Sequence, residues 1–431
     1  MTNKSPGRPI CGIFDQGATL KQSAQVEPTS RGKLFRVALI IETSTSFGRR
    51  LFSGIAAYIR ENGPWFVDFG ERSVYDPVPP WLKKWGGDGI ISRVPSPEIG
   101  RLVAKLGVPV VDLNEQLRGL GAPLISNDHV TIGRLAAEHL LQRGFTRFGN
   151  IGHPGFFWAD KRCEEFARTV RAAGHSCEEF RGKAEDLRAL SQRSWGMETD
   201  DVARWVSGLS KPVGIMACDD FRAVQLLAAC VLDDVAVPEQ VAVIGVGDDD
   251  VACELANPPL SSVMLNARRM GYEAAALLDR LMRGESPPEQ ELRIPPLGVV
   301  TRQSTDLTAI ADPVVAKAMR FIREHACEGI NVEDVLRHVL MSRTALQDHF
   351  RNTVKRSIHD VIVDTRIRRV TEMLAAGILS LADITERAGF KHVEYMSNVL
   401  KKRTGWTPAR YRREYGSPAA KVASRHFLKD R

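Results

Sequence analysis

Short apolar runs alternate with longer amphipathic segments from Phe35 to Met282. The run from Val37 to Ile41 ends in small polar residues, as expected of a buried strand that enters a loop. Segment 49–63 then has apolar residues at helical spacing and ends in a glycine. By the same criteria we predict strands at 65–69, 89–92, 108–113, 147–152, 213–218 and 241–246, and helices at 98–106, 131–143, 159–173, 221–231 and 267–282.

The predicted strands are apolar throughout and alternate with helices. That combination indicates parallel sheets whose two faces are both covered by helices. Residues 34–305 are long enough for two lobes of this kind. Ligands of such sheets bind beyond the carboxyl ends of the strands. We therefore predict a two-lobed α/β domain over 34–305, with any ligand site in the loops that follow its strands.

The pattern changes after a polar, proline-rich stretch at 283–296. From Val314 onward the apolar residues keep helical spacing and no strand-like run occurs, so a second domain begins shortly before that residue. Segments 331–350 and 380–402 each have the pattern of a helix, a short turn and a helix, and a long helix is predicted between them. We predict an all-α domain over 306–415 that contains two helix-turn-helix units.

Positive charge is concentrated at the C-terminal end of the chain. Residues 312–431 hold 23 basic and 14 acidic residues, a net charge of +9, whereas the remainder holds 36 basic and 38 acidic residues. This asymmetry favours a polyanion-binding module attached to a nearly neutral body, the alternative being a basic domain without such a partner. Two helix-turn-helix units in a basic domain favour two recognition helices that enter successive segments of the DNA major groove.

The segment "GFKHVEYMSNVLKKRTGWTPARYRR" (389–413) resembles the signature of the AraC/XylS family of transcription regulators. The likeness lies in Gly-Phe at the turn, the apolar helix positions, and then Lys-Lys, Gly-x-Thr-Pro and Tyr-Arg. The chain departs from the family at Met396 and Leu400, where Phe is usual, and at Leu340, where the turn of the first unit usually has Gly. A leucine at that turn must adopt a positive φ or reshape the turn.

Carried over by position, this resemblance implies ten residues that contact double-stranded DNA. The base-reading candidates of the first unit are Arg343, Thr344 and Gln347, with Arg351 on phosphate. Those of the second unit are His392, Glu394, Tyr395 and Asn398, with Lys391 and Lys401 on phosphate. Arginine can bridge guanine, and asparagine or glutamine can bridge adenine, in the major groove. Alternatively, each of these residues is an exposed polar side chain of a solvated helix and does not contact DNA.

Two segments of the α/β region resemble the ligand domains of LacI-type and periplasmic-binding-type proteins. They are "SNDHVTIGRLAAEHLLQRGFTRFGNIG" (126–152) and "VPEQVAVIGVGDDDVACELANPPLSSV" (237–263). A ligand domain of this type followed by an AraC-type domain is similar to regulators of sugar operons, those for xylose above all. The resemblance implies a cytoplasmic homodimer that binds two DNA half-sites at a sugar-catabolic promoter, responds to a small, xylose-like sugar, and contacts RNA polymerase if it activates.

Sugar recognition needs paired hydrogen-bonding groups and an aromatic face, which strand-end loops can supply. The candidates are Ser46, Phe47, Arg49, Asp88, Phe157, Trp158, Arg162, Asp219, Asp220 and Asp248. Arg162, Asp220 and Asp248 match the ligand-contact positions of the family best. Gly247 stands where relatives often have Asp, so another sugar, or none, stays open. Phe157 and Trp158 could instead pack between the lobes, and the aspartates from Asp248 could form a solvated loop.

Other function classes find little support in the sequence. The chain contains no G-x-x-x-x-G-K-[ST], G-x-S-x-G or H-E-x-x-H motif, so we predict neither an enzyme nor a cofactor. Its seven cysteines are widely spaced without a C-x-x-C pair, which favours free thiols and no metal site. No run is long and apolar enough to span a membrane. We expect a flexible tail over 1–33 and a basic tail over 416–431. A regulator whose α/β body only dimerises or binds a non-sugar effector, and a nonspecific DNA binder, stay as alternatives.

Overall fold

The first lobe is built on a four-stranded parallel sheet with the strand order β2-β1-β3-β4. In the computed structural model its strands are β1 (Arg36–Ile40), β2 (Phe66–Asp68), β3 (Gly89–Ser92) and β4 (Val110–Asp112). The helices of this lobe are α1 (Ser46–Asn62), the 3-10 helix η1 (Pro80–Lys84), α2 (Pro97–Lys105) and α9 (Ala267–Met282). One apolar cluster joins the sheet to α1 and α9, and another joins its opposite face to η1 and α2.

The structure describes residues 34–415 apart from 74–75, 94–96, 115–120, 181, 183–198, 289–290, 307–311 and 378. The two predicted tails, 1–33 and 416–431, therefore lie outside the described residues. So does segment 307–311, which directly follows the predicted boundary between residues 305 and 306.

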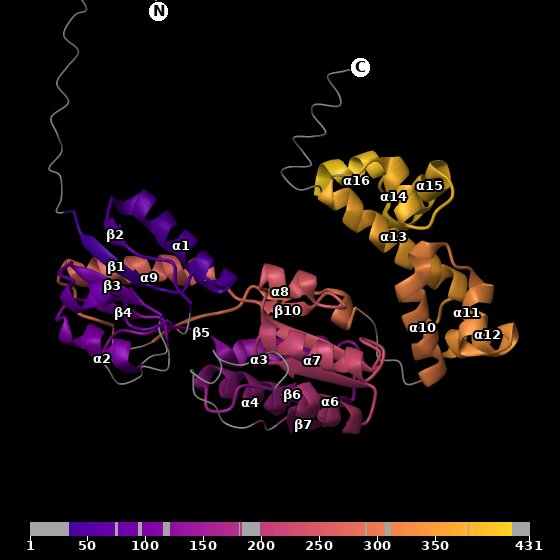
Figure 1. The fold of residues 1–431 in the computed structure, drawn as a ribbon, viewed down its shortest axis with the longest axis horizontal. Coiled ribbons are helices and arrows are strands. Elements are labelled where there is room, and N and C mark those ends of the chain that lie inside the picture. Colours follow the sequence, from indigo (N-terminus) through magenta and orange to yellow (C-terminus); the bar gives the residue numbers. More distant parts are fainter. Residues whose placement is uncertain are drawn as a thin grey trace, which may run out of the picture.

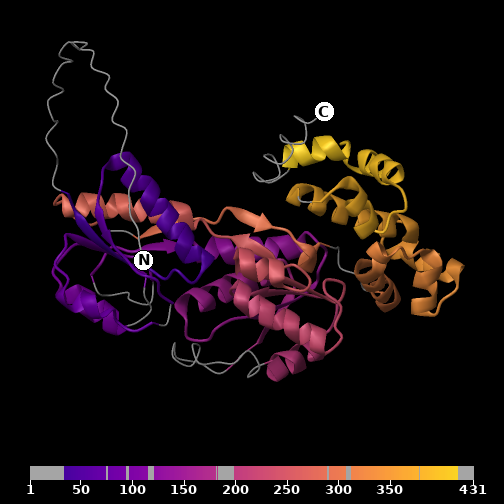
Figure 2. The ribbon, with the colours of Figure 1, turned by 45° about the horizontal axis from the view of Figure 1, so that its top comes forward.

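Helices α1 and α9 pack side by side although they are about 200 residues apart in the sequence (Figures 1 and 2). Two glycines make the close approach possible. A Cβ atom on Gly54 would lie 1.9 Å from the carbonyl oxygen of Arg268, and one on Gly271 would lie 2.1 Å from that of Leu51. Both positions exclude a side chain, so glycine fixes how α9 returns to the first lobe.

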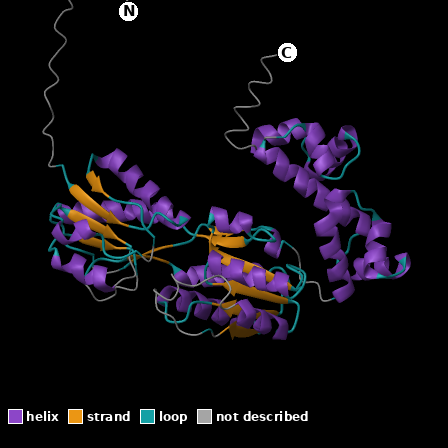
Figure 3. Ribbon diagram, in the orientation of Figure 1, coloured by secondary structure: helices purple, strands orange, loops and turns teal. Residues whose placement is uncertain are grey.

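The second lobe is built on a six-stranded sheet with the order β12-β10-β9-β8-β6-β7, in which only the β10–β12 pair is antiparallel. Its strands are β6 (Arg147–Ile151), β7 (Ser176–Phe180), β8 (Val213–Ala217), β9 (Val241–Gly247), β10 (Ser261–Met264) and β12 (Gly298–Val300). Its helices are α3 (His129–Leu141), α4 (Phe157–Ala172), α6 (Thr199–Gly208), α7 (Asp220–Leu232), α8 (Asp250–Leu255) and the 3-10 helix η3 (Gln303–Thr305). Helices cover both faces of the sheet (Figure 3).

The chain crosses between the lobes three times. Strand β5 (Ile125–Asn127) enters the second lobe, and β11 (Leu292–Ile294), which pairs with it in parallel, follows α9 on the way back. The third crossing joins the end of β10 to the start of α9. Because all three crossings run through the junction of the lobes, the parallel strands of both sheets have their carboxyl ends there.

The C-terminal domain consists of helices alone and lies on the far side of the second lobe from the first (Figure 1). Its elements are α10 (Pro313–His325), η4 (Ala326–Glu328), α11 (Val332–Val339), α12 (Arg343–Thr353), α13 (Ile358–Ala376), α14 (Leu381–Arg387), α15 (Val393–Thr404) and α16 (Pro408–Tyr415). The long helix α13 contributes to two separate apolar cores, one with α10 to α12 and one with α14 to α16.

The predicted fold class is confirmed, and every element predicted in the two lobes is present with ends shifted by a few residues. Five short strands were not predicted: β5, β7, β10, β11 and β12. Strand β7 reads SCEEF, and β10 begins with two serines. Both sequences are too polar to stand out as strands.

The six cysteines among the described residues are all free thiols, and Cys11 lies outside these residues. Among the described residues, no helix combines the length and apolar character that a membrane span requires.

Candidate effector site and DNA-binding surface

The carboxyl ends of three strands bring polar side chains to the junction of the lobes. Asp219 and Asp220 follow β8, and Asp248 and Asp249 follow β9, whereas Ser46 follows β1 in the other lobe. Each of Asp219 and Asp249 caps the helix that begins there by accepting a hydrogen bond from a backbone amide. These local caps account for a short polar side chain at both strand ends, aspartate being one of the favoured N-cap residues.

Two polar contacts join the lobes directly. The amide and the hydroxyl of Ser46 both donate to Oδ2 of Asp249, at 3.2 and 2.7 Å. Arg50, one turn further along α1, donates to the backbone carbonyl of Asp248 at 2.9 Å. Phe47 packs against the apolar cores of both lobes. Ser46 is therefore a contact between the lobes, a role the sequence did not suggest.

Asp220 lies at the centre of a buried hydrogen-bond network. Its carboxylate accepts a hydrogen bond from the Ser262 hydroxyl at 2.6 Å and from the Asp249 amide at 2.7 Å. Only 2% of the residue is exposed. Burial raises the pKa of Asp220 to about 7, because desolvation outweighs the hydrogen bonds that favour the charged form. Asp220 thus connects the ends of β8, β9 and β10 and through Asp249 reaches the first lobe.

Arg162 is buried on α4 beside the same strand ends. Its Nη1 donates to the carbonyl of Cys218 at 2.7 Å, and its Nε donates to Nδ1 of His129 at 3.2 Å. The guanidinium carbon lies 4.9 Å from the ring centre of Trp158, so the two predicted residues stack. Trp158 is also partly packed against the core of the second lobe.

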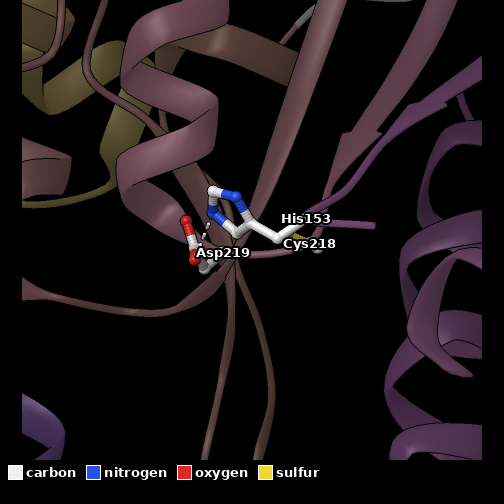
Figure 4. Close-up of side chains that lie close together, drawn as sticks. All are labelled: His153, Cys218 and Asp219. Carbon is white, nitrogen blue, oxygen red and sulfur yellow. Dashed lines mark ion pairs between the residues drawn. The ribbon is translucent and has the colours of Figure 1, made fainter. Parts of the chain in front are cut away.

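His153 and Asp219 form an ion pair whose side chains point toward each other, with Cys218 beside them (Figure 4). Nε2 of His153 lies 3.3 Å from Oδ2 of Asp219. Burial opposes ionisation of Asp219, but the hydrogen bond and charge of His153 outweigh it and lower the pKa of the carboxyl. Within the described ranges this is the one group of three such side chains that could share a metal ion. The thiol of Cys218 is fully buried, and desolvation raises its pKa well above the ordinary value.

The side chain and the amide of Asp248 contact residues of its own lobe. Its Oδ1 lies 2.8 Å from Nη2 of Arg302, and its amide donates to the Ser262 hydroxyl at 3.0 Å. The backbone φ is 53° at Asp248 and 135° at Gly247, so the chain turns sharply here. Gly247 could not carry the Asp of relatives without strain, and a Cβ there would meet the Asp220 carboxylate at 2.8 Å.

The other three predicted ligand residues differ in position. Arg49 is exposed on α1 and donates to the carbonyls of Thr43 and Ser44 at 3.0 and 3.1 Å, and its charge helps to lower the pKa of Asp249 at the junction. Phe157 begins α4 and is 38% exposed. Asp88 precedes β3, and its carboxylate accepts a hydrogen bond from the Arg36 amide at 2.8 Å. Asp88 therefore lies at the amino edge of its sheet, opposite the lobe junction.

Sequence reasoning missed four residues of the junction. Glu42 and Arg93 follow β1 and β3, form an ion pair, and place the guanidinium 4.6 Å from the ring centre of Phe47. His153 follows β6. For these three residues, the position after a parallel strand is a signal that could have found them. Arg302 follows β12, which runs antiparallel, and only its contact with Asp248 places it in this group.

The first lobe also contains a cavity of 340 Å³, between α2, β4 and segment 121–123. Its lining is largely apolar and meets the junction only at Ser92 and Asp112. The junction is the stronger candidate for a ligand site, because polar side chains of both lobes converge there.

All ten predicted DNA contacts lie on exposed positions of the helical domain. Arg343 begins α12, whose first turn is capped by the hydroxyl of Ser342. Its guanidinium is paired with Glu333 of α11, so this base-reading candidate already has a carboxylate partner. In the second unit His392 stands at the N-cap position of α15, but its side chain makes no capping hydrogen bond.

The two turns of the helix-turn-helix units have the same left-handed backbone. Leu340 has φ 57° and ψ 42°, and Gly389 has φ 72°. The leucine therefore adopts the positive φ and does not reshape the turn, with 87% of the residue exposed. At the second turn a Cβ atom would lie 2.7 Å from the carbonyl oxygen of Cys327, so glycine is required there.

Other arginines of this domain hold its helices together. Arg366 donates to the carbonyls of Ala326 and Ile330, both at 2.7 Å, and so ties α13 to the first unit. Arg403, at the end of α15, pairs with Asp360 and Asp364 of α13 at 2.5 and 3.0 Å. Basic residues in this domain therefore serve both structure and surface charge.

Comparison with known proteins identifies both domains. The model of a periplasmic binding protein-like domain matches residues 137–305, and that of a helix-turn-helix domain matches residues 335–414. The xylose operon regulatory protein of Escherichia coli (strain K12) is 32% identical over 88% of this chain and 97% of its own length. That of Haemophilus influenzae (strain Rd) is 28% identical over 88% and 98%. The solved structure of a xylose-binding transcription activator superposes with a TM-score of 0.78 at 30% identity, covering 89% of this chain and 99% of that one.

Proposed function

Because the chain belongs to the family of the xylose operon regulatory proteins, we propose that xylose or a closely related small sugar binds at its lobe junction and controls its binding to DNA. The observation that carries the proposal is the convergence of polar side chains and a tryptophan from strand ends at a junction of two lobes. The regulated site is then a sugar-catabolic promoter in the cytoplasm.

The charges at the junction support an uncharged ligand. Asp219 is paired with His153, Asp248 with Arg302, and Glu42 with Arg93. A sugar phosphate or sugar acid would bring a further negative charge close to these three carboxylates, each of which already has a basic partner. The hydroxyls of a neutral sugar can instead join the existing hydrogen bonds of these pairs, and Trp158 can cover a face of C–H groups.

The proposed control is a shift between two arrangements of the lobes. Ser46 and Asp249 face each other across the junction, beside the residues to which we assign the ligand. A ligand that binds one arrangement more tightly shifts the protein toward it by the difference in binding free energy. A regulator of this type typically shows coupling of about fivefold to 150-fold between effector and DNA.

A homodimer on two half-sites follows from the same proposal. Phe66 and Phe69 are exposed at the edge strand β2, and Phe221 and Val231 are exposed on α7. These apolar side chains are candidates for contacts between two copies of the chain. Two copies would bring four recognition helices to the DNA, and an activating form would also contact RNA polymerase.

Calorimetric melting with a panel of pentoses, hexoses and sugar alcohols tests the effector half of the proposal. A sugar present at 100 times its Kd adds about 2.7 kcal/mol to the stability of the domain that binds it. We expect xylose or a close relative to raise the melting temperature, and Asp219→Asn to reduce the shift. Asp233→Asn, at the other end of α7, is the matched control. A cooperative transition that no sugar moves would contradict the proposal.

A further inference from the structure

Two arginines on one face of α10 contact the second lobe. Arg320 and Arg323 are three residues apart and so lie on the same side of the helix. Nη1 of Arg320 lies 2.6 Å from Oδ1 of Asp234 and donates to the Asp234 carbonyl at 3.1 Å. Arg323 pairs with the carboxylate of Glu239. Both acidic residues stand in the segment that joins α7 to β9.

The two ion pairs differ in burial. Glu239 is fully buried, and its second carboxylate oxygen has no hydrogen-bond partner among the described residues. Arg323 is 18% exposed, whereas the Asp234 side chain is 86% exposed. An exposed pair contributes little, but a buried carboxylate that loses its one cationic partner is left uncompensated. Of the two pairs, loss of Arg323–Glu239 therefore carries the larger cost in free energy.

The elements on either side of Glu239 lead back to the lobe junction. Helix α7 has its N-cap at Asp219 and ends before Asp234, and β9 begins after Glu239 and ends before Asp248. Thirteen helical residues span about 20 Å. Both elements are buried in one apolar core, so they can transmit a displacement of their ends without bending.

We propose that the Arg323–Glu239 pair is the contact through which the effector at the lobe junction sets the position of the DNA-binding domain. This inference rests on the proposed function. A sugar that displaces Asp219 or Asp248 displaces the start of α7 or the end of β9. The other ends of these elements carry Asp234 and Glu239, and α10 follows them because Arg323 is bound there.

The test uses the full chain with Arg323→Gln, and with Glu239→Gln to remove the buried charge as well. Arg320→Gln, which breaks the exposed pair on the same helix, is the matched control. For each variant we would measure the melting shift with xylose, the affinity for DNA selected by the wild-type protein, and the ratio of DNA affinities with and without xylose.

We expect Arg323→Gln to keep the melting shift with xylose, and to keep the DNA affinity without sugar within about twofold of the wild-type value. The ratio of its DNA affinities with and without xylose should be close to one. Arg320→Gln should keep the ratio of the wild type. The Arg323→Gln, Glu239→Gln double variant should be as uncoupled as Arg323→Gln alone but more stable. An unchanged ratio in Arg323→Gln would overturn the inference.

Small-angle X-ray scattering separates this inference from the proposed function. Without any ligand, Arg323→Gln should increase the radius of gyration relative to the wild type and to Arg320→Gln, because α10 leaves the second lobe. Unchanged dimensions would refute the docking role even if xylose regulates the wild type. If no sugar changes the melting or the DNA binding of the wild type, but Arg323→Gln has the larger radius of gyration, the proposed function is refuted and the docking contact is established.

Discussion

The hydroxyl of Ser46 in the first lobe donates to the carboxylate of Asp249 in the second lobe at 2.7 Å. This bond crosses the lobe junction beside Asp220, whose carboxylate accepts the amide of Asp249. The lobes therefore touch through polar groups, and the proposed effector would bind beside this contact.

Removing the Ser46 hydroxyl is predicted to weaken effector binding. A hydrogen bond to a charged group contributes about 1.5 to 3 kcal/mol, and part of it is regained from water when the lobes separate. We expect Ser46→Ala to lower the affinity for the sugar about tenfold, measured by titration calorimetry. Ser53→Ala, which removes an exposed hydroxyl on the same helix, is the control. Equal affinities for the two variants would show that the Ser46–Asp249 bond does not hold the lobes.

Asp220 is predicted to make the stability of the α/β domain depend on pH. Its pKa is about 7 in the folded protein and near 4 in an unfolded chain. Between these values the folded state binds more protons than the unfolded state, so the free energy of unfolding falls as pH rises from 4 to 7. Asp220→Asn should remove this part of the slope in melting experiments, and Asp200→Asn, at an exposed position, should not. Parallel slopes for Asp220→Asn and the wild type would disprove the assignment.

Arg343 is predicted to read one base. Arg343→Ala should cost about 1 to 3 kcal/mol in binding to the selected DNA and relax specificity at a single position. Glu333→Ala frees the guanidinium from its carboxylate partner and should raise the affinity. Arg337→Ala, an exposed arginine paired on α11, is the control. A uniform loss across unrelated sequences would make Arg343 a phosphate contact.

Leu340→Gly is predicted to stabilise the helical domain. A left-handed backbone costs a residue with a Cβ atom about 1 to 2 kcal/mol, and Leu340 is too exposed to regain that by packing. We expect a gain of about 1 kcal/mol in denaturant unfolding, reduced by the greater freedom of glycine in the unfolded chain. Leu340→Ala keeps the Cβ atom and should show no such gain. Destabilisation by glycine would mean that the exposed leucine makes a contact that matters.

The sequence predicted the architecture because its signals are local. Buried strands that alternate with helices, and the turn at Gly389, are visible in short windows. The departure at Leu340 was also visible, and the structure shows that the backbone keeps the family's turn. Strands β7 and β10 were not predicted, because they are stabilised by tertiary contacts and their sequences contain no apolar run. The Ser261 hydroxyl, for example, donates to the Arg302 carbonyl at 2.9 Å.

The candidate site was predicted only in part. Strand ends led to Asp219, Asp220 and Asp248, which lie at the lobe junction, but Asp88 precedes its strand and so faces the opposite edge. Which partner each side chain chooses depends on residues far apart in sequence, as with Ser46 and Asp249. No spacing rule connects positions that distant, so the lobe contact and the Arg323–Glu239 pair required the structure.

In the proposed function a small sugar controls specific DNA binding. The decisive measurement is a titration of labelled DNA, selected by the protein from a random pool, at one fixed salt concentration with and without xylose. We predict that xylose changes the affinity for selected DNA at least about fivefold and leaves the affinity for unrelated DNA unchanged. Equal affinities with and without xylose, from protein whose melting the sugar also fails to shift, would contradict the account.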